Sequence, residues 1–222
     1  MKIYVIGNSN NKFLPLNNIR EKFYVNEKHE GENIDFLNPW YCELTGLYYM
    51  CKHSKEDIIG LEHYRRYFVN EKNQILSEEE IDDLLKTNDV ICRKWDFVIM
   101  SRGRTTNAWD YLAENTKAYI LKFLNNCTEE EKTFIMNKLK TLPYFGQCNM
   151  FICKKSIIDD YCNWFFSHCD CYTTEDLKNY PRCVGFVSEF IFSAYLMYKN
   201  YKIKWNPVNE FSKDLSRVVC RF

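Results

Sequence analysis

The chain has 222 residues, of which 46% are apolar, and its 30 basic and 30 acidic side chains cancel to a formal net charge of zero. This length and apolar content predict a single domain over residues 1–222 that buries a sizeable core, and they exclude a disordered protein. Nucleic acid is not expected as the main partner, because binding it needs net positive charge or a long basic stripe.

Cysteine is unusually frequent, with eleven in the chain. The amino-terminal residues lack the apolar run and small-residue cleavage site of a signal peptide, so we expect a cytoplasmic, reduced protein. In that compartment disulfides are rare, and the cysteines are interpreted as small buried hydrophobes. No uncharged apolar run approaches the roughly 20 residues needed to cross a membrane.

The first half of the chain contains two short apolar runs that are typical of buried strands, residues 3–6 and 57–61. Between them, Asn38-Pro39 predicts a helix start, and the helix that follows to Cys51 is apolar nearly all round. Such a helix is buried, so Glu43 and Gly46 on its remaining side must meet other protein or a ligand.

The rest of the chain continues the alternation of helices and strands. Helices are predicted after capping boxes at Ser77/Glu80 and Thr128/Glu131, over 109–124, after a cap at Ser156 and over 184–200; strands are predicted at 90–92, 97–100, 148–153 and 201–205. This alternation favours an α/β domain with a mostly parallel central sheet flanked by helices. Ligands then bind beyond the carboxyl ends of the strands, so the loops after Ile6, Leu61 and Cys153 are the candidate sites.

The segment from Gly60 to Phe68 carries an unusual cluster of side chains at a predicted strand end, namely His63, Tyr64, Arg65, Arg66, Tyr67 and Phe68. Arginine forks suit a diphosphate, which they bind through paired charge-assisted hydrogen bonds. The alternative is a solvated basic patch that anchors a sheet edge through ion pairs. In an extended segment, one of the two arginines should point inward and the other outward.

Glu189 lies near the start of the strongly apolar helix predicted over 184–200 and is a candidate general base, because burial among Phe186, Phe190 and Ile191 would raise its pKa toward neutrality. The alternative is a first-turn carboxylate stabilised by the helix dipole. Glu43 poses the same question, since a buried glutamate is rare unless it is paired.

Metal sites have weak support in the sequence. His168, Cys169, Cys171 and Cys183 could bind zinc, but they lack the paired two-residue separations of structural zinc sites, so core thiols are favoured over a zinc-stabilised interaction domain. Walker, GxGxxG, GxSxG and HExxH motifs are absent, and the predicted strand-end loops carry no Asp-x-Asp pair.

Four segments, in order, resemble the successive signatures of a bacterial capsule and exopolysaccharide glycosyltransferase family long filed as a domain of unknown function: Asn38 to Tyr49 (NPWYCELTGLYY), Ile59 to Phe68 (IGLEHYRRYF), Asn149 to Ile152 (NMFI) and Gly185 to Glu189 (GFVSE). The resemblance implies a GT-A-like (Rossmann-like) nucleotide-sugar-binding fold. It also implies a nucleoside-diphosphate sugar as donor and a growing glycan or lipid-linked saccharide as acceptor. The hexose transferred by some relatives is galactose, including its furanose form.

The resemblance also assigns roles to residues. The block His63, Tyr64, Arg65 and Arg66 stands where other GT-A enzymes hold metal-binding aspartates, which suggests that cations replace the metal at the departing diphosphate, with no cofactor. Glu189 matches the position of the base in inverting enzymes. Glu43 and Asn149 would contact the sugar or shape the pocket.

The chain departs from the family pattern in two places. Between about 102 and 142 an expected histidine is replaced by the sequence Thr105 to Asp110, and Gly7-Asn8-Ser9 stands where relatives tend to show histidine or lysine. The resulting hypothesis is an inverting cytoplasmic glycosyltransferase, with peripheral contact at the inner face of the membrane left open. The alternative is a catalytically silent sugar- or nucleotide-binding module, or a partner subunit of a polysaccharide assembly complex.

Overall fold

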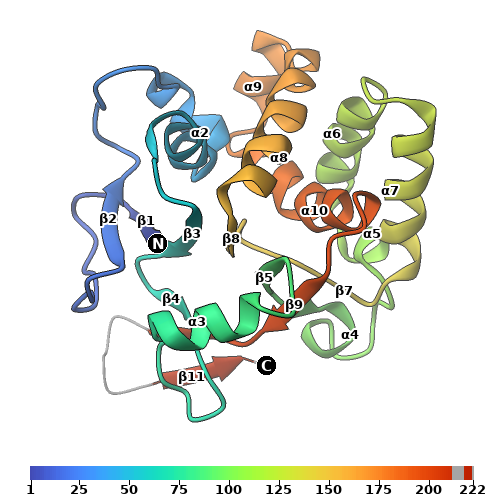
Figure 1. Cartoon of the computed structure of the whole chain (residues 1–222). Helices are drawn as coiled ribbons and strands as arrows, with labels where there is room; N and C mark the ends of the chain where they lie inside the picture. Colours follow the sequence, from blue (N-terminus) through green and yellow to red (C-terminus); the bar gives the residue numbers. More distant parts are fainter. Residues whose placement is uncertain (212–217, 222) are drawn as a thin grey trace.

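The computed structural model describes residues 1–211 and 218–221, which form a nine-stranded sheet, a separate two-stranded sheet and the helices packed on them (Figure 1). The strands of the large sheet are β1 (Lys2–Gly7), β2 (Arg20–Tyr24), β3 (Ile58–His63), β4 (Arg66–Phe68), β5 (Val90–Arg93), β8 (Phe151–Lys154), β9 (Ile203–Asn206), β10 (Val208–Phe211) and β11 (Val218–Arg221). Strands β6 (Trp95–Asp96) and β7 (Tyr144–Phe145) pair with each other.

The sheet is mixed, and β3 lies at its centre. Strands β2, β1, β3, β8, β5 and β9 are neighbours in that order, and β4, β10 and β11 continue beyond the hairpin at the end of β3. The pairs β1/β2, β1/β3 and β5/β9 are parallel, and the other pairs are antiparallel. Within the described chain β1, β2, β3, β5, β9 and β10 share one direction, which is six of the nine strands.

The helices are α1 (Asn38–Tyr41), α2 (Leu44–His53), α3 (Glu78–Leu85), α4 (Phe97–Met100), α5 (Ala108–Tyr111), α6 (Glu114–Leu124), α7 (Glu129–Thr141), α8 (Lys155–Ser167), α9 (Thr174–Asn179) and α10 (Cys183–Tyr198), with 3-10 turns at Asp35–Leu37 and Cys169–Cys171. Alternate residues of the strands point to opposite faces of the sheet: Phe151 belongs to the larger core and Ile152 to the smaller one. Helices α2, α6, α7, α8 and α10 pack in the larger core, and α3 packs in the smaller one.

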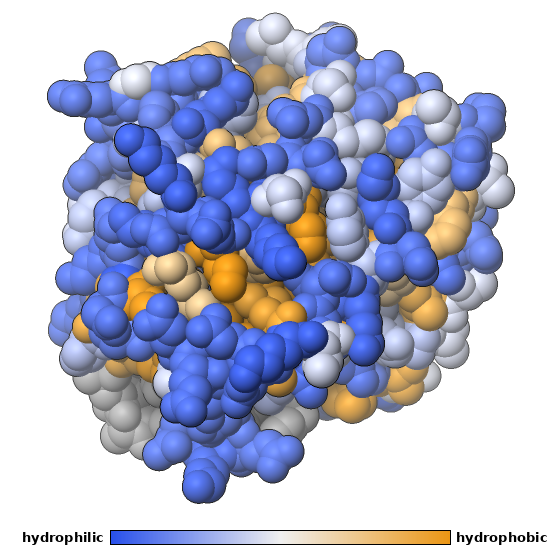
Figure 2. Space-filling view, viewed as in Figure 1, coloured by the Kyte–Doolittle hydropathy of each residue, from blue (hydrophilic) through white to orange (hydrophobic). Residues whose placement is uncertain are grey.

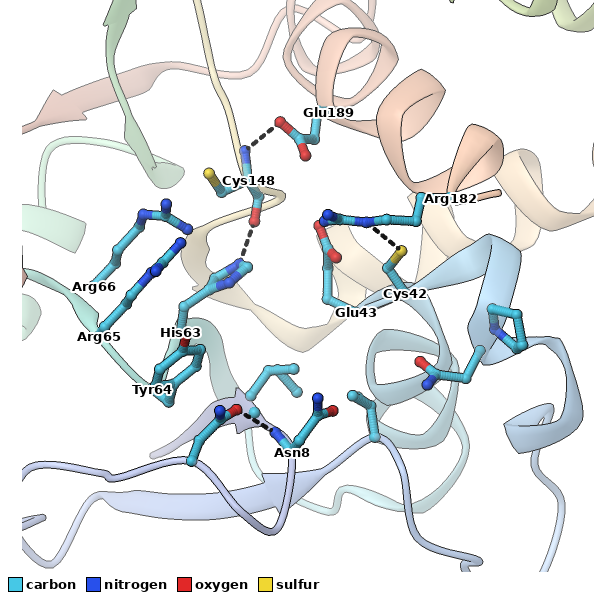
Figure 3. A pocket seen from close by; sticks show the side chains of 16 residues that line it. Asn8, Cys42, Glu43, His63, Tyr64, Arg65, Arg66, Cys148, Arg182 and Glu189 are labelled. Atoms are coloured by element: carbon cyan, nitrogen blue, oxygen red, sulfur yellow. Dashed lines mark hydrogen bonds between the residues drawn. The ribbon is translucent and has the colours of Figure 1, made fainter. Parts of the chain in front are cut away.

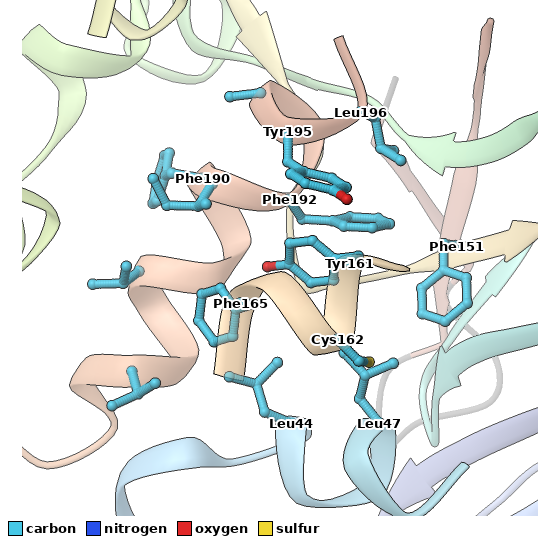
Figure 4. Packing of buried hydrophobic residues seen from close by; sticks show 14 of the residues in the cluster. Leu44, Leu47, Phe151, Tyr161, Cys162, Phe165, Phe190, Phe192, Tyr195 and Leu196 are labelled. Carbon is cyan, nitrogen blue, oxygen red and sulfur yellow. The ribbon is translucent and has the colours of Figure 1, made fainter. Parts of the chain in front are cut away.

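Helix α10 is the centre of the larger core. It is buried on nearly all sides, and α6, α7 and α8 pack against it. Phe192 and Tyr195 meet the ring of Tyr161 on α8, with ring centroids 4.7 and 5.3 Å apart (Figure 4). Because α10 is tightly packed, the side chains near its amino-terminal end are held in fixed positions.

Hydrophilic residues cover most of the face seen in Figure 2, with apolar residues showing mainly near its middle and at the lower right edge. Among the described residues, no helix combines the length and the apolar character needed to cross a membrane.

The predicted helix from Asn38 to Cys51 is two helices, because Cys42 has a left-handed backbone (φ 53°) that interrupts it. Asn38 is the first helical residue and gives no side-chain cap. Glu43 directly precedes α2 and makes no side-chain capping hydrogen bond, and Gly46 packs on the sheet, where a Cβ would lie 2.7 Å from Ile6 Cδ1. Glu43 and Gly46 were both expected to contact other protein or a ligand, and Gly46 contacts protein.

Other predictions are corrected by local capping. Residues 97–100 are helical, because the Asp96 side chain accepts a hydrogen bond from the Ile99 amide. The predicted helix 109–124 is divided where Leu112 and Ala113 are extended. Helix α8 begins at Lys155, one residue before the predicted cap, whereas the capping boxes at Ser77 and Thr128 are confirmed.

Candidate active site

A cavity of about 460 Å³ opens at the carboxyl ends of β1 and β3, a size suited to a small organic ligand. Its lining is mostly polar and comes from six segments of the chain: Ile6, Gly7, Asn8, Asn11, Val25, Asn38, Pro39, Cys42, Glu43, His63, Tyr64, Arg65, Arg66, Cys148, Arg182 and Glu189 (Figure 3). None of these residues lies between 102 and 142, where the sequence departs from the family pattern.

The parallel pairing of β1 and β3 brings two predicted loops together. The loops after Ile6 and Leu61 both line the cavity, as expected for the carboxyl ends of parallel strands. The prediction for Cys153 is wrong, because β8 runs antiparallel to β3 and its carboxyl end lies at the opposite edge. Cys148, which precedes β8, lines the cavity instead.

Arg65 and Arg66 line the same side of the cavity (Figure 3). Their predicted opposite orientation is wrong, because His63 pairs with Arg66 across a tight hairpin whose turn is Tyr64-Arg65, so the segment is not extended. Glu210 on β10 lies 3.5 Å from Arg65 Nε and 3.4 Å from Arg66 Nη2. The alternative of a basic patch that anchors a sheet edge predicts ion pairs, and these two pairs are present. Both are long, however, and the buried Nε of each arginine lacks a hydrogen-bond partner.

Arg182 stands across the cavity from these two arginines, beside Glu43 (Figure 3). It precedes α10 in a left-handed conformation (φ 65°), and its Nε donates a hydrogen bond to Cys42 Sγ at 3.4 Å. The sequence analysis missed this residue. A usable signal was its position at the amino-terminal end of an apolar helix, where a positive charge is unfavourable unless an anion compensates for it.

His63 contributes no positive charge to the cavity. Its Nε2 lies 2.7 Å from the carbonyl oxygen of Cys148, which can only accept, so Nε2 carries the hydrogen. Burial, and after it the neighbouring guanidinium charges, lower the pKa of His63 to about 3. The neutral ring ties β3 to the segment that precedes β8.

Glu189 enters the cavity from the second turn of α10, since the helix begins at Cys183. It is therefore not a first-turn carboxylate. Its Oε2 accepts a hydrogen bond from the Cys148 amide at 3.1 Å. Burial, followed by the charge of Glu43, raises the pKa of Glu189 to about 7.

Glu43 faces the same cavity with only 6% of its surface exposed. Its Oε1 accepts a hydrogen bond from Asn149 Nδ2 at 2.9 Å, and burial raises its pKa. With both carboxyl pKa values raised, the pair holds a proton more readily than exposed glutamates would.

Asn149 lies behind Glu43 and does not line the cavity. Its Oδ1 accepts a hydrogen bond from Ser188 Oγ at 2.8 Å, and that hydroxyl lies 2.8 Å from the hydroxyl of Tyr161. Cys148 and Asn149 both have left-handed backbones (φ 63° and 49°), an uncommon conformation for such residues. This strained turn thus places Cys148 at the cavity and Asn149 behind it.

In the described part of the chain, the four residues considered as zinc ligands do not form a group whose ligand atoms all lie within 4.8 Å of one another. Cys169 is buried and donates to the Phe165 carbonyl oxygen, and Cys183 is buried at the start of α10. The ten cysteines among residues 1–210 are all free thiols. Five of them are buried, in agreement with their interpretation as core residues: Cys92, Cys153, Cys162, Cys169 and Cys183. The other five are half-buried, and two of these, Cys42 and Cys148, line the cavity, so the interpretation does not hold for them.

The arrangement has two chemical capacities. Three guanidiniums on opposite sides of one cavity can bind an anion with several oxygens, such as a diphosphate. A carboxyl group with a pKa near 7 in the same cavity can accept a proton from a bound hydroxyl at neutral pH.

Comparison with known proteins agrees with this fold. The profile of a family described as "Domain of unknown function (DUF4422)" matches residues 5–200. Among solved structures, the apo structure of the WbbM bifunctional glycosyltransferase is similar, with a TM-score of 0.75 and 22% sequence identity over 99% of this chain and 46% of that one. The chain thus spans a little under half the length of WbbM, and no curated protein matches it.

Proposed function

The chain belongs to the DUF4422 family and has a fold seen in a glycosyltransferase, and from this premise we propose that it transfers a hexose from a nucleoside-diphosphate sugar to a glycan or lipid-linked saccharide. Galactose, in its pyranose or furanose form, is the proposed hexose, on the resemblance already described. The observation that carries the proposal is the pairing, within one cavity, of three guanidiniums with a glutamate whose pKa is about 7.

The guanidiniums are proposed to bind the donor diphosphate. Arg65 and Arg66 lie on one side of the cavity and Arg182 on the other, so their guanidiniums can approach a bound diphosphate from two sides. Negative charge builds up on the diphosphate as the bond to the sugar breaks, and fixed cations in a partly buried cavity stabilise that charge. Tyr64 and His63 shape this end of the site.

Glu189 is proposed as the general base. Its ionised carboxylate takes the proton of the acceptor hydroxyl while the hydroxyl oxygen attacks the anomeric carbon and the diphosphate departs from the opposite face. This single displacement inverts the configuration at the anomeric carbon. Glu43, held by Asn149, lies beside Glu189 in the cavity and is proposed to contact the transferred sugar.

We propose that this reaction proceeds without a chelated metal. Guanidiniums occupy the strand-end position where relatives with the same type of fold carry chelating aspartates, and a divalent cation is repelled there. Addition of Mg²⁺ or Mn²⁺ should therefore leave kcat/KM unchanged. A rate that rises with either cation contradicts this part of the proposal.

Donor turnover by the wild type and by Glu189→Gln tests the proposal. The wild type should release nucleoside diphosphate from its donor, and Glu189→Gln should lower the rate by about 10²–10⁴-fold, the range for loss of a general base, with donor affinity nearly unchanged. Glu175→Gln, at an exposed position on α9, is the matched control and should turn over donor like the wild type. A fully active Glu189→Gln overturns the assignment, and a wild type that binds donor without turnover supports the silent binding module.

A further inference from the structure

Three metal-ligating side chains gather outside the cavity, at the junction of three helices. Cys127 lies between α6 and α7, Glu131 in the first turn of α7, and His168 directly after α8, and one ligand atom from each lies within 4.8 Å of the others. All three are half-buried, and none lines the cavity. The proposed transferase reaction therefore does not use them.

The ring of His168 is oriented as in a metal ligand. Its Nδ1 lies 2.6 Å from the carbonyl oxygen of Trp164, so Nδ1 carries the hydrogen and Nε2 keeps a free lone pair. Metal-binding histidines almost always donate their other ring N–H to a carbonyl or carboxylate in this way, which fixes the tautomer.

The carboxylate of Glu131 is also held in place by neighbours. Its Oε1 accepts a hydrogen bond from Trp164 Nε1 at 2.8 Å, and its Oε2 accepts one from the Thr128 amide at 2.9 Å. Burial raises its pKa, but the hydrogen bonds from Thr128 and Trp164 lower it more, so the pKa lies below its usual value and the group is ionised. Trp164 thus orients both the carboxylate and the imidazole.

Cys127 completes the group with a thiol that has only a weak partner. Its Sγ donates to the Phe123 carbonyl oxygen at 3.6 Å. Zinc takes cysteine as the thiolate, so a bound ion would displace the thiol proton to solvent.

We propose that Cys127, Glu131 and His168 bind a zinc ion that fastens the start of α7 to the end of α8. Thiolate, imidazole and carboxylate are the ligands that zinc takes in proteins, and a water molecule would fill the fourth position. Ligands about 2.0–2.3 Å from zinc in a tetrahedron stand roughly 3.3–3.7 Å apart, so ligand atoms that all lie within 4.8 Å of one another need to approach by at most about 1.5 Å. Of the ligands considered from sequence, His168 alone belongs to this set.

Zinc stoichiometry and cobalt absorption test the proposal. Chelator-treated full-length protein is titrated with Zn²⁺ alone, and one ion per chain should bind and raise the melting temperature. Cys127→Ser and His168→Gln should each weaken zinc binding at least about 100-fold, and Co²⁺ should give a thiolate-to-cobalt absorption band that Cys127→Ser abolishes. Cys51→Ser, which changes a half-buried thiol on α2, is the control and should bind zinc like the wild type.

Any of three results would overturn the proposed zinc site. Substoichiometric zinc in the wild type, unchanged affinity in both ligand variants, or a cobalt complex without the thiolate band would mean that the group only caps helices. If Cys127→Ser fails to fold, the cobalt spectrum of the wild type and the affinity of His168→Gln decide. Donor turnover is not a readout here, so the zinc site and the proposed transferase reaction fail independently.

Discussion

Glu43 and Glu189 enter one cavity from different helices, and the charge of the first adds to burial in raising the pKa of the second to about 7. Sequence reasoning anticipated both carboxylates, because a glutamate in an apolar helix needs a partner or a function. It could not show that they meet, since α2 and α10 are far apart in the chain. Arg182 was not predicted for the same reason, because its role depends on Arg65 and Arg66 across the cavity, which are far from it in the sequence.

The pH dependence of transfer follows from this pair. A general base must be ionised, so kcat/KM of the wild type should rise with pH through about 7 and then level off. Glu43→Gln removes a negative charge that raises the pKa of Glu189, so this rise should move to lower pH even if the maximal rate falls. A profile measured across neutral pH checks the shift; an unchanged or alkaline-shifted rise contradicts the coupling.

Arg182→Gln should weaken donor binding. A hydrogen bond to a charged group contributes about 1.5–3 kcal/mol, so the donor KM should increase about 10–100-fold. Arg104→Gln, at an exposed position away from the cavity, should leave the donor KM unchanged. Equal KM values for the two variants would remove Arg182 from the site.

At the scale of elements, the β3–β4 hairpin positions Arg65 and Arg66, and a buried ion pair holds the hairpin in place. Arg20 Nε donates to Glu62 Oε2 at 2.7 Å, and Glu62 Oε1 accepts a further bond from the Phe68 amide at 3.0 Å. Both side chains are almost fully buried. The pair joins β2, β3 and β4. From the sequence, Glu62 was only part of the segment from Gly60 to Phe68, and no role was predicted for it.

Glu62→Ala should destabilise the protein strongly. Removing one partner of a buried ion pair leaves an uncompensated charge and typically costs about 3–5 kcal/mol. The free energy of unfolding from urea titration measures this cost. Glu56→Ala, which removes a partly exposed carboxylate that pairs with the amino terminus, should cost far less. Similar losses for the two variants would show that the hairpin does not depend on the buried pair.

The elements themselves were predictable where the signal is local. Capping boxes fixed the starts of α3 and α7, because they depend on residues three apart. The short apolar run at 97–100 was mistaken for a strand, since periodicity does not separate a buried strand from one helical turn. Strands β2, β4 and β10 depend on pairing with distant segments and were not predicted.

At the scale of the whole molecule, zero net charge conceals a local concentration of cations. Three arginines gather around one cavity although acidic and basic residues balance over the chain. The alternation of elements predicted an α/β sheet and two of the loops that line the cavity. It did not predict that β8 runs against β3, and this reversal places Cys148 at the cavity in place of the loop after Cys153.

The central claim is that this cavity binds a nucleoside-diphosphate sugar through its arginines. A thermal-shift screen of nucleotide sugars against the wild type, Arg66→Gln and Arg104→Gln tests it most directly, because a ligand of the folded state raises the melting temperature with its concentration. The account predicts that at least one nucleotide sugar stabilises the wild type and Arg104→Gln, and that Arg66→Gln loses most of this stabilisation. No stabilisation by any nucleotide sugar, or equal stabilisation of all three proteins, would contradict it.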